Sequence, residues 1–215
     1  MKVSIICSST DHPVNTMLFD WIARHQVTHD ITLARSTDEL TYGDILFLIS
    51  CTEIITAVDR AKFSNTLLIH ASDLPKGRGW SPHIWEILNG AEEVTVSLLE
   101  AEDRVDSGAI WKKLRVTIPK HALHNEINEI LFRVESDLMD FAVKEFPFAH
   151  PQAQDTLVEP SYFSRRTPAD SEINPEQTLV SQFNLIRVCD PLRFPANFSL
   201  YGHCYKITLE KIEND

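Results

Sequence analysis

Glycine is scarce in this chain, and its absence from the N-terminal part excludes one common kind of site. Only six of the 215 residues are glycine, and none lies between Met1 and Thr41. The first strand, loop and helix that we expect, over residues 2–25, therefore lack the glycine-rich turn that lets a backbone approach a phosphate group. A glycine-rich nucleotide-phosphate loop at this position is excluded.

Paired cysteines, an excess of basic charge and long apolar runs are also missing. The four cysteines, Cys7, Cys51, Cys189 and Cys204, show no Cys-x-x-Cys spacing, which favours free thiols in a reducing cytoplasm over a metal site. A formal net charge of −11 argues against a nucleic-acid surface, which needs clustered Lys and Arg. No apolar run approaches the ~18 residues of a membrane span, and the chain enters a strand without a signal peptide. We expect a cytoplasmic protein without metal, nucleic-acid or membrane partners.

The sequence does contain short apolar runs that alternate with amphipathic segments. Runs typical of buried strands cover residues 2–7, 31–34, 44–50, 66–69, 94–99 and 110–118. Helical spacing and stop signals predict helices over residues 14–25, 83–88, 121–146 and 175–189, and residues 197–212 favour a β-hairpin. This order predicts an α/β, Rossmann-like domain with a mostly parallel sheet. We expect a catalytic core at 1–150 and a C-terminal extension at 151–215, a helix plus a β-hairpin, packed on the same domain.

Residues 67–111 hold the candidate catalytic pair. His70 ends one apolar run and Asp106 follows the next, so we expect each just past the end of a strand, where ligands bind in open α/β sheets. A carboxylate beside an imidazole holds its orientation and favours its charged form. Such a pair can take a proton from an attacking nucleophile. On chemistry alone, a structural His and a surface Asp fit these residues equally well.

A longer motif runs through the same stretch. It comprises His70, Ser72, Leu74-Pro75, Arg78-Gly79, Pro82, Trp85, Ile87, Gly90, Asp106-Ser107-Gly108 and Ile110. In this order the motif resembles the 10-formyltetrahydrofolate-dependent formyltransferases, which include methionyl-tRNA formyltransferase, glycinamide ribonucleotide transformylase and the sugar N-formyltransferases. The resemblance is clear over residues 44–111 and weaker out to about residue 205. It implies formyl transfer from 10-formyltetrahydrofolate to a primary amine, with His70 and Asp106 as the catalytic residues and no metal.

The resemblance also implies a folate site between two loops. One loop carries Cys51, Glu53, Ile54 and Ile55, and matches the family loop that meets the pterin ring; an ordinary strand-to-helix turn is the alternative. The other loop carries Asp103 and Val105. We expect the cosubstrate at the mouth between them.

Acceptor contacts are expected from two further segments. Ser72, Lys76, Arg78 and Trp80 follow His70, and two cations with an aromatic ring suit an anionic, ring-shaped substrate; a solvated loop anchored by Trp80 is the alternative. Arg165 and Arg166 stand in a Tyr-Phe…Arg-Arg-x-Pro-x-Asp segment that resembles the sugar N-formyltransferases. For these two arginines the alternative is a surface pair held by Asp170 and Glu172.

The acceptor class follows by elimination within the resembling family. Methionyl-tRNA formyltransferases carry a C-terminal tRNA domain that we do not expect here, and the net charge is wrong for tRNA. The expected acceptor is therefore an amino sugar, often linked to a nucleotide, in surface or flagellin glycan synthesis. A homodimer is left open. Glycinamide ribonucleotide transformylation is an alternative, disfavoured because the N-terminal glycines are missing.

Leu68 is the one clear departure from the family pattern. The family has Asn two residues before the catalytic His, where it holds the formyl oxygen as negative charge develops. Leu68 has no donor for that role, and Asn65 is not at the matching position. A folate- or sugar-binding relative that has lost catalysis is therefore a further alternative.

Overall fold

The computed structural model describes residues 1–212, and a six-stranded sheet forms its centre. In spatial order the strands are β2 (Asp30–Ala34), β1 (Lys2–Ile6), β3 (Gly43–Leu48), β4 (Phe63–His70), β6 (Glu93–Glu100) and β7 (Ile110–Thr117). The first four strands are parallel, whereas β6 runs antiparallel to both β4 and β7. The predicted α/β, Rossmann-like fold with a mostly parallel sheet is confirmed.

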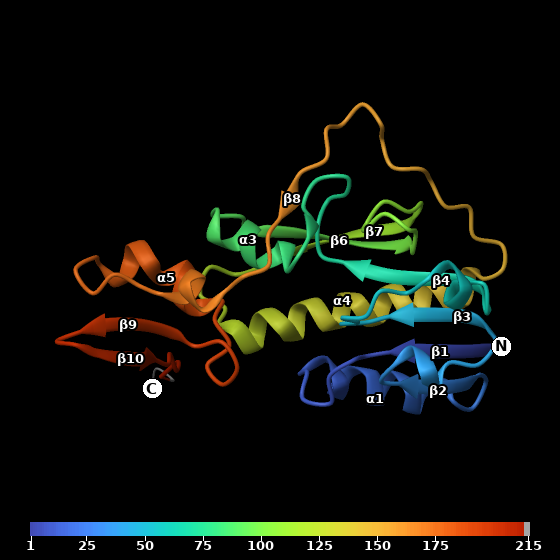
Figure 1. Cartoon of the computed structure of the whole chain (residues 1–215), viewed down its shortest axis with the longest axis horizontal. Coiled ribbons are helices and arrows are strands. Elements are labelled where there is room, and N and C mark those ends of the chain that lie inside the picture. The colour runs from blue at the N-terminus through green and yellow to red at the C-terminus, as the bar shows by residue number, and fades with distance from the viewer. Residues whose placement is uncertain (213–215) are drawn as a thin grey trace.

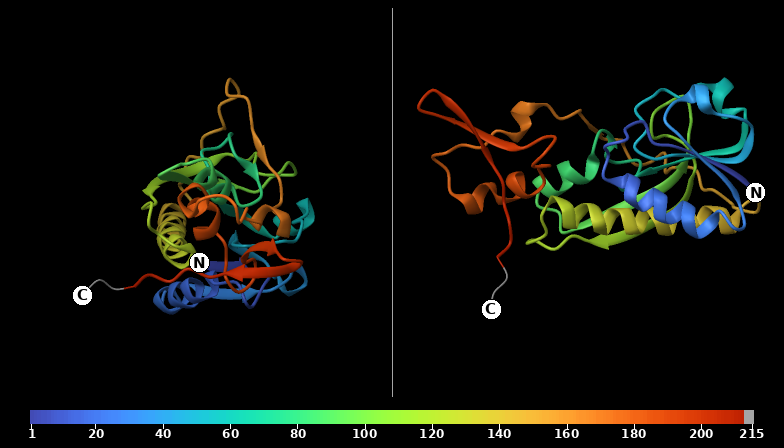
Figure 2. Two further views of the ribbon diagram at one scale, coloured as in Figure 1. Left: turned by 90° about the vertical axis from the view of Figure 1, so that its left-hand side faces the viewer. Right: turned by 90° about the horizontal axis from the view of Figure 1, so that it is seen from below.

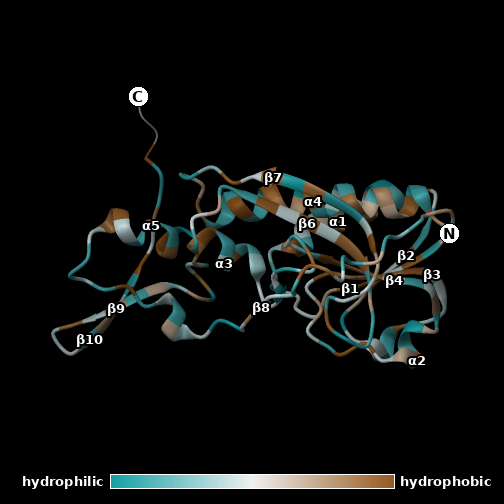
Figure 3. Cartoon of the chain, turned by 90° about the horizontal axis from the view of Figure 1, so that it is seen from above, coloured by the Kyte–Doolittle hydropathy of each residue, from teal (hydrophilic) through white to brown (hydrophobic). Residues whose placement is uncertain are grey.

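Two long helices lie side by side against one face of this sheet (Figures 1 and 2). They are α1 (Val14–His25) and α4 (His124–Glu145), and α4 alternates hydrophobic and hydrophilic bands along its length (Figure 3). Leu18 of α1, Leu138 of α4 and Phe47 of β3 are fully buried in the shared core. Trp21 of α1 packs there too, and its indole N–H donates to Asp140 of α4 at 2.6 Å. This hydrogen bond joins the two helices.

The bounds of α1 agree with the prediction, but α4 and the C-terminal helix begin later. The expected helix at 121–146 starts at His124, because the main-chain N–H of Leu123 is capped by the Glu126 carboxylate at 2.8 Å. The expected helix at 175–189 is α5 (Leu179–Arg187), because the Thr178 hydroxyl accepts from the N–H of Ser181 at its first turn. Local capping therefore set these two boundaries.

Short elements complete the chain around the sheet. They are η1 (Thr37–Glu39), α2 (Ala57–Arg60), β5 (Arg78–Gly79), α3 (Pro82–Leu88), β8 (Tyr162–Phe163), η2 (Pro168–Ser171), β9 (Ala196–Leu200) and β10 (His203–Ile207). Strand β8 pairs in parallel with β5, and so ties the C-terminal part to the loop after β4. Within residues 1–212, no helix is both long and apolar enough to cross a membrane.

The C-terminal part has a small hydrophobic core of its own. Ile173, Ile186, Cys189 and Ala196 are buried together, and β9 and β10 form the predicted hairpin beside them. Arg187 connects this unit to the main domain, because its guanidinium donates to the carbonyls of Pro119 and Ala122 at 3.0 and 3.1 Å. The division into 1–150 and 151–215 stays a prediction.

Candidate active site

His70 is the last residue of β4, and it is held by the loop that follows it. The residue is 8% exposed, and its Nε2 lies 2.8 Å from the carbonyl oxygen of Gly77. A carbonyl only accepts, so Nε2 carries a proton, and in the neutral ring Nδ1 carries the lone pair. The structure thus assigns the basic nitrogen of the neutral His70 ring.

Asp106 reaches His70 by a route that the sequence did not predict. We expected it just past the end of a strand, as we did for His70, but the strand before it, β6, runs antiparallel to β4. Where β6 ends, the N–H of Ala101 donates to the carbonyl of Thr66, four residues before His70. The loop then turns back, and the Asp106 Oδ2 lies 3.6 Å from the His70 Nε2. The two side chains do meet, but through a reversing loop.

The Asp106 carboxylate is buried beside a main-chain donor. It is 7% exposed, and its Oδ2 accepts from the N–H of Gly79 at 2.8 Å. Its backbone has φ 54°, a left-handed conformation that is uncommon for residues other than glycine. A carboxylate held at a burial of this degree next to an imidazole stabilises positive charge on that ring.

Glycine is required at two points of this arrangement. A Cβ at Gly79, whose φ is +100°, would collide with the carbonyl oxygen of Phe163 in β8. A Cβ at Gly108 would collide with the main chain of Glu100, where the returning loop crosses the end of β6. Both contacts are backbone on backbone, so a side chain at either position would move the loops that carry the pair.

The structure brings the two expected folate loops together through Arg60, which the sequence did not indicate. Arg60 in α2 donates to the carbonyl of Ile55 at 2.8 Å and forms an ion pair with Asp103. Ile54 and Val105 are 90% and 66% exposed, so each loop presents an apolar side chain to solvent. Arg60 therefore connects the two loops, and exposed apolar side chains flank the mouth between them.

The other residues of the first loop face inward or toward their neighbours. Ile55 is buried against Leu46 and Phe63, and the Glu53 carboxylate accepts from the N–H of Thr37 at 3.0 Å. The Cys51 thiol is half-buried, and burial raises its pKa. Of the two isoleucines predicted to contact folate on this loop, Ile54 is exposed and Ile55 is buried.

The residues expected to contact the acceptor after His70 differ in exposure. Lys76 is exposed, whereas Ser72 is completely buried and its hydroxyl has no partner among the described residues. Arg78 is 5% exposed, and its guanidinium donates to the Gln154 side-chain oxygen at 2.7 Å and to the Tyr162 hydroxyl at 3.3 Å. Arg78 thus serves first as a link between loops.

Trp80 follows β5 in the chain, and the two later arginines follow β8. Trp80 is 46% exposed, and the Arg165 guanidinium stands 4.9 Å from the centre of its ring. Arg166 instead donates to the carbonyl of Asp170 at 2.6 Å and to the hydroxyl of Ser171 at 3.1 Å. Arg166 is therefore held by its own turn, and Arg165 is the more available cation.

Sequence reasoning also missed the role of Tyr162. Its hydroxyl accepts hydrogen bonds from Arg78 and Arg104, and these bonds lower its pKa. The two arginines come from separate loops, 84 and 58 residues away in the chain. No local pattern signals such a contact.

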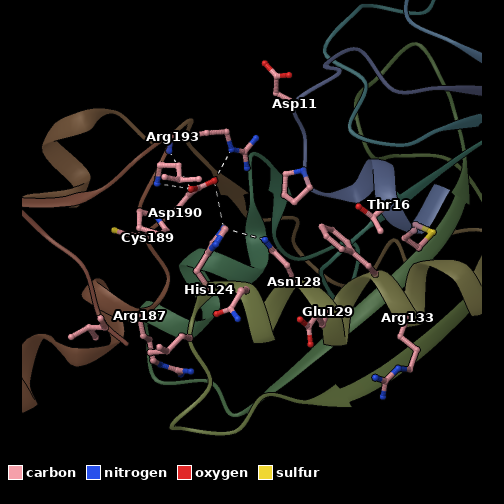
Figure 4. Close-up of a pocket in the computed structure, with 18 of the residues that line it drawn as sticks. Asp11, Thr16, His124, Asn128, Glu129, Arg133, Arg187, Cys189, Asp190 and Arg193 are labelled. Carbon is pink, nitrogen blue, oxygen red and sulfur yellow. Dashed lines mark hydrogen bonds and ion pairs between the residues drawn. The ribbon is translucent and has the colours of Figure 1, made fainter. Parts of the chain in front are cut away.

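A cavity separate from this pair lies between α1, α4 and the C-terminal part (Figure 4). Its volume is about 960 Å³, and neither His70 nor Asp106 lines it. At its upper end, Asp190 lies 3.9 Å from His124 and 2.6 Å from Arg193 (Figure 4).

Two histidines near this cavity have lowered pKa values. Burial lowers the pKa of His12 to about 4. Burial, and then the charge of His70, lower the pKa of His83 to about 4. Residues 1–212 contain no group of three or more His, Cys, Asp or Glu that would hold a metal ion.

Comparison with known proteins identifies a matching family and several solved structures with a similar fold. The profile of a family described as formyl transferase matches residues 9–143, which include His70 and Asp106. Methionyl-tRNA formyltransferase from Clostridium thermocellum is 22% identical, with a TM-score of 0.80 over 99% of this chain and 94% of that one. A sugar N-formyltransferase from Shewanella sp is 19% identical, with a TM-score of 0.71 over 99% of each chain.

HypX from Aquifex aeolicus, solved in complex with tetrahydrofolic acid, is also similar. It is 17% identical, with a TM-score of 0.73 over 95% of this chain and 36% of that one. At these identities, the similarity to the three solved structures establishes the fold alone.

Proposed function

The chain belongs to the formyl transferase family, and from that premise we propose that it transfers a formyl group from 10-formyltetrahydrofolate to a primary amine. The observation that carries this proposal is the His70–Asp106 pair, 3.6 Å apart and buried beside a loop. Both residues lie inside the matched stretch. A positioned acid–base pair is what formyl transfer to an amine requires, because a proton must leave the amine during the reaction.

The proposed reaction exchanges one carbon–nitrogen bond for another. The neutral amine attacks the formyl carbon, the new C–N bond forms, and the bond from that carbon to N10 of the folate breaks. The amine loses a proton and N10 gains one, so charge and atoms balance. Negative charge gathers on the formyl oxygen in the tetrahedral intermediate, and a donor there lowers the barrier.

His70 fits the central role because only one of its nitrogens is committed. Nε2–H donates to Gly77, so Nδ1 is the nitrogen available to the reacting groups. When Nδ1 is protonated, it donates to the formyl oxygen as a cation, which gives a stronger hydrogen bond than a neutral donor. Asp106, 3.6 Å from Nε2, stabilises that charge and keeps the ring oriented.

The folate is proposed at the mouth between residues 51–55 and 103–106. Arg60 joins these two loops, and Ile54 and Val105 offer exposed apolar contacts for a flat heterocycle. HypX, which has a similar fold, was solved with tetrahydrofolic acid, and that complex supports the choice of cosubstrate.

For the acceptor we propose an amino sugar, carried on a nucleotide. The exposed Trp80 ring with Arg165 beside it offers a stacking surface and a cation for a ring with an anionic substituent. The net charge of −11 disfavours tRNA. Length does not separate the two acceptor classes, because this chain covers 94% of a methionyl-tRNA formyltransferase and 99% of a sugar N-formyltransferase.

Leu68 favours a second candidate, a folate-binding relative without catalysis. Side chains alternate along β4, so Leu68 shares a face with His70. Leu68 lies where the family has its oxyanion donor, and it donates nothing. The Asn65 side chain faces the other way and donates to Glu100 at 3.3 Å, so it does not substitute.

Two measurements on the purified chain separate these candidates: folate calorimetry, and a product assay with nucleotide-linked amino sugars and, in parallel, with methionyl-tRNA. Calorimetry with tetrahydrofolate tests the cosubstrate, and loss of all binding by folded protein removes the formyl-transfer proposal. Incubation with 10-formyltetrahydrofolate and UDP- or dTDP-linked amino sugars, followed by mass spectrometry, tests for a product heavier by one formyl group. Folate binding without product from any amine favours the non-catalytic candidate, and product from methionyl-tRNA alone corrects the acceptor.

A further inference from the structure

The connector, residues 147–161, links α4 to β8 and touches both loops of the candidate active site. In Figure 1 it arches from the end of α4 to β8. Gln152 pairs with Ile110 through two main-chain hydrogen bonds of 2.7 and 2.8 Å, next to the returning Asp106 loop. Ser161 accepts from the N–H of Gly77 through its hydroxyl and from that of Arg78 through its carbonyl, both at 2.9 Å. The connector is therefore attached at both ends of the site.

Gln154 lies between these attachments and uses its whole amide group. Its Nε2 donates to the carbonyl of Asp106 at 2.8 Å and to that of Gly108 at 3.0 Å. Its Oε1 accepts from the Arg78 guanidinium at 2.7 Å. Two acceptors face the NH₂ and a cation faces the oxygen, so the contacts define the orientation of the amide.

These bonds hold the turn that gives Asp106 its unusual backbone. The Gln154 side chain holds the carbonyls of residues 106 and 108, and Asp106 itself adopts φ 54°. A left-handed conformation at a residue other than glycine persists only where the surroundings enforce it. With its carbonyl fixed on one side, Asp106 places its carboxylate on Gly79 and beside His70.

We propose that Gln154 is a positioning residue, which holds Asp106 in the geometry that orients and charges His70. This role rests on the proposed formyl transfer. Gln154 acts through Asp106, 48 residues earlier in the chain, and makes no contact with His70 among the bonds of the described residues. The connector thereby makes correct placement of the acid–base pair depend on a segment outside the two loops that carry it.

The sharpest variant is Gln154→Glu, which keeps the shape and the acceptor for Arg78. It removes the two N–H donors and sets a carboxylate oxygen against two carbonyls. Gln154→Ala removes the bonds without adding that repulsion, and should act in the same direction with a smaller effect. Gln152→Glu is the matched control, because it makes the same change two residues away on an exposed side chain bonded only to the His150 carbonyl.

The first readout does not need activity. Hydrogen exchange of the Gly79 N–H reports the Asp106 carboxylate that it donates to, and the Ile110 and Gln152 N–H groups report attachment of the connector. In Gln154→Glu we expect Gly79 to exchange about tenfold faster while Ile110 and Gln152 keep their rates, as the loss of about one hydrogen bond implies. Unchanged Gly79 exchange overturns the proposal, as does equal acceleration at all three groups, which would mean that the connector had merely detached.

The second readout is the split between kcat and KM. A lost positioning bond should lower kcat about tenfold or more and leave the folate KM within about twofold, and the control should match wild type. A raised folate KM with kcat intact overturns the proposal. A wild-type protein that transfers no formyl group refutes the proposed function instead, and the exchange measurement still decides whether Gln154 positions Asp106.

Discussion

The hydrogen-bonded junction around His70 and the large cavity between α1 and α4 are built in opposite ways. The junction is assembled from loops at residues 70–79, 104–108 and 151–163, and three hydrogen bonds of 2.8 Å lie within or between them: His70 to Gly77, Gly79 to Asp106, and Gln154 to Asp106. The cavity is lined mostly by two helices and the turn at residues 186–193, and its lining combines carboxylates and guanidiniums with apolar side chains. Its volume of about 960 Å³ lies at the upper end of the range of small-molecule pockets. The proposed chemistry is assigned to the junction because of its polar contacts, and not because of cavity volume.

Replacing His70 or Asp106 with Ala should have the largest effect of any change in either region. Each should lower kcat about a hundredfold or more, because a positioned acid–base group contributes about that much. The double variant should lose much less than the product of the single losses, because the two residues act as one unit. Steady-state rates with 10-formyltetrahydrofolate measure both.

His124→Ala is the control for that prediction, since it removes an imidazole from the cavity. It should change kcat by less than about threefold, because His124 contacts Asp190 and Asn128 and lies outside the junction. An equal loss in His124→Ala and His70→Ala would break the contrast between the two regions. A double variant that simply multiplies the single losses would break the pairing of His70 with Asp106.

On the cavity side, we expect a pH effect on stability from His12. Its Nδ1 accepts from the N–H of Val14 at 3.2 Å, which requires a neutral ring, and its folded pKa of about 4 lies below the ordinary 6.5. The unfolded chain therefore binds the proton first as pH falls, and stability present above 6.5 is lost between about 6.5 and 4. For a partly exposed ring, the loss from pH 7 to pH 5 should be about 1 kcal/mol.

His12→Asn tests this prediction, because Asn supplies an acceptor for Val14 without titrating. Urea unfolding at pH 7 and pH 5 should show a free energy that falls by about 1 kcal/mol less in the variant than in wild type. The other titrating groups are common to both proteins and cancel. Equal falls in the two proteins would show that His12 is not kept neutral by the fold.

The Trp80–Arg165 pair should give a smaller effect, at the rim of the junction. Arg165→Ala removes the guanidinium 4.9 Å from the ring centre and any contact with an anionic acceptor, so the acceptor KM should rise about threefold with kcat unchanged. Arg166→Ala is the control, because Arg166 is bonded to Asp170 and Ser171; it should lower thermal stability and leave that KM unchanged. An unchanged acceptor KM in Arg165→Ala would show that Arg165 is a surface cation without a role in acceptor binding.

The contrast also explains how much the sequence could predict. Periodic side chains form the helices that wall the cavity, so the bounds of α1 and a mostly parallel sheet followed from local pattern, whereas the spatial order of the strands did not. His70 and Asp106 were found as residues, but their meeting depends on a loop that reverses after an antiparallel strand. Arg60 and Gln154 were missed, because their partners lie 43 and 48 residues away and no periodicity records such contacts.

The smallest effect is expected where the chain departs from its family, at Leu68. An Asn there would share the β4 face of His70 and reach toward the developing oxyanion. If that oxyanion had no donor, adding one would raise kcat by about 10²–10³. We expect less than a threefold change, because in the proposed mechanism His70, with Nε2–H fixed on Gly77 and Asp106 nearby, supplies that donor from Nδ1. Leu68→Gln, longer by one methylene, controls for the loss of apolar packing. A tenfold or larger gain in Leu68→Asn alone would show that the oxyanion lacks a donor in the natural chain, and that charged His70 does not supply it.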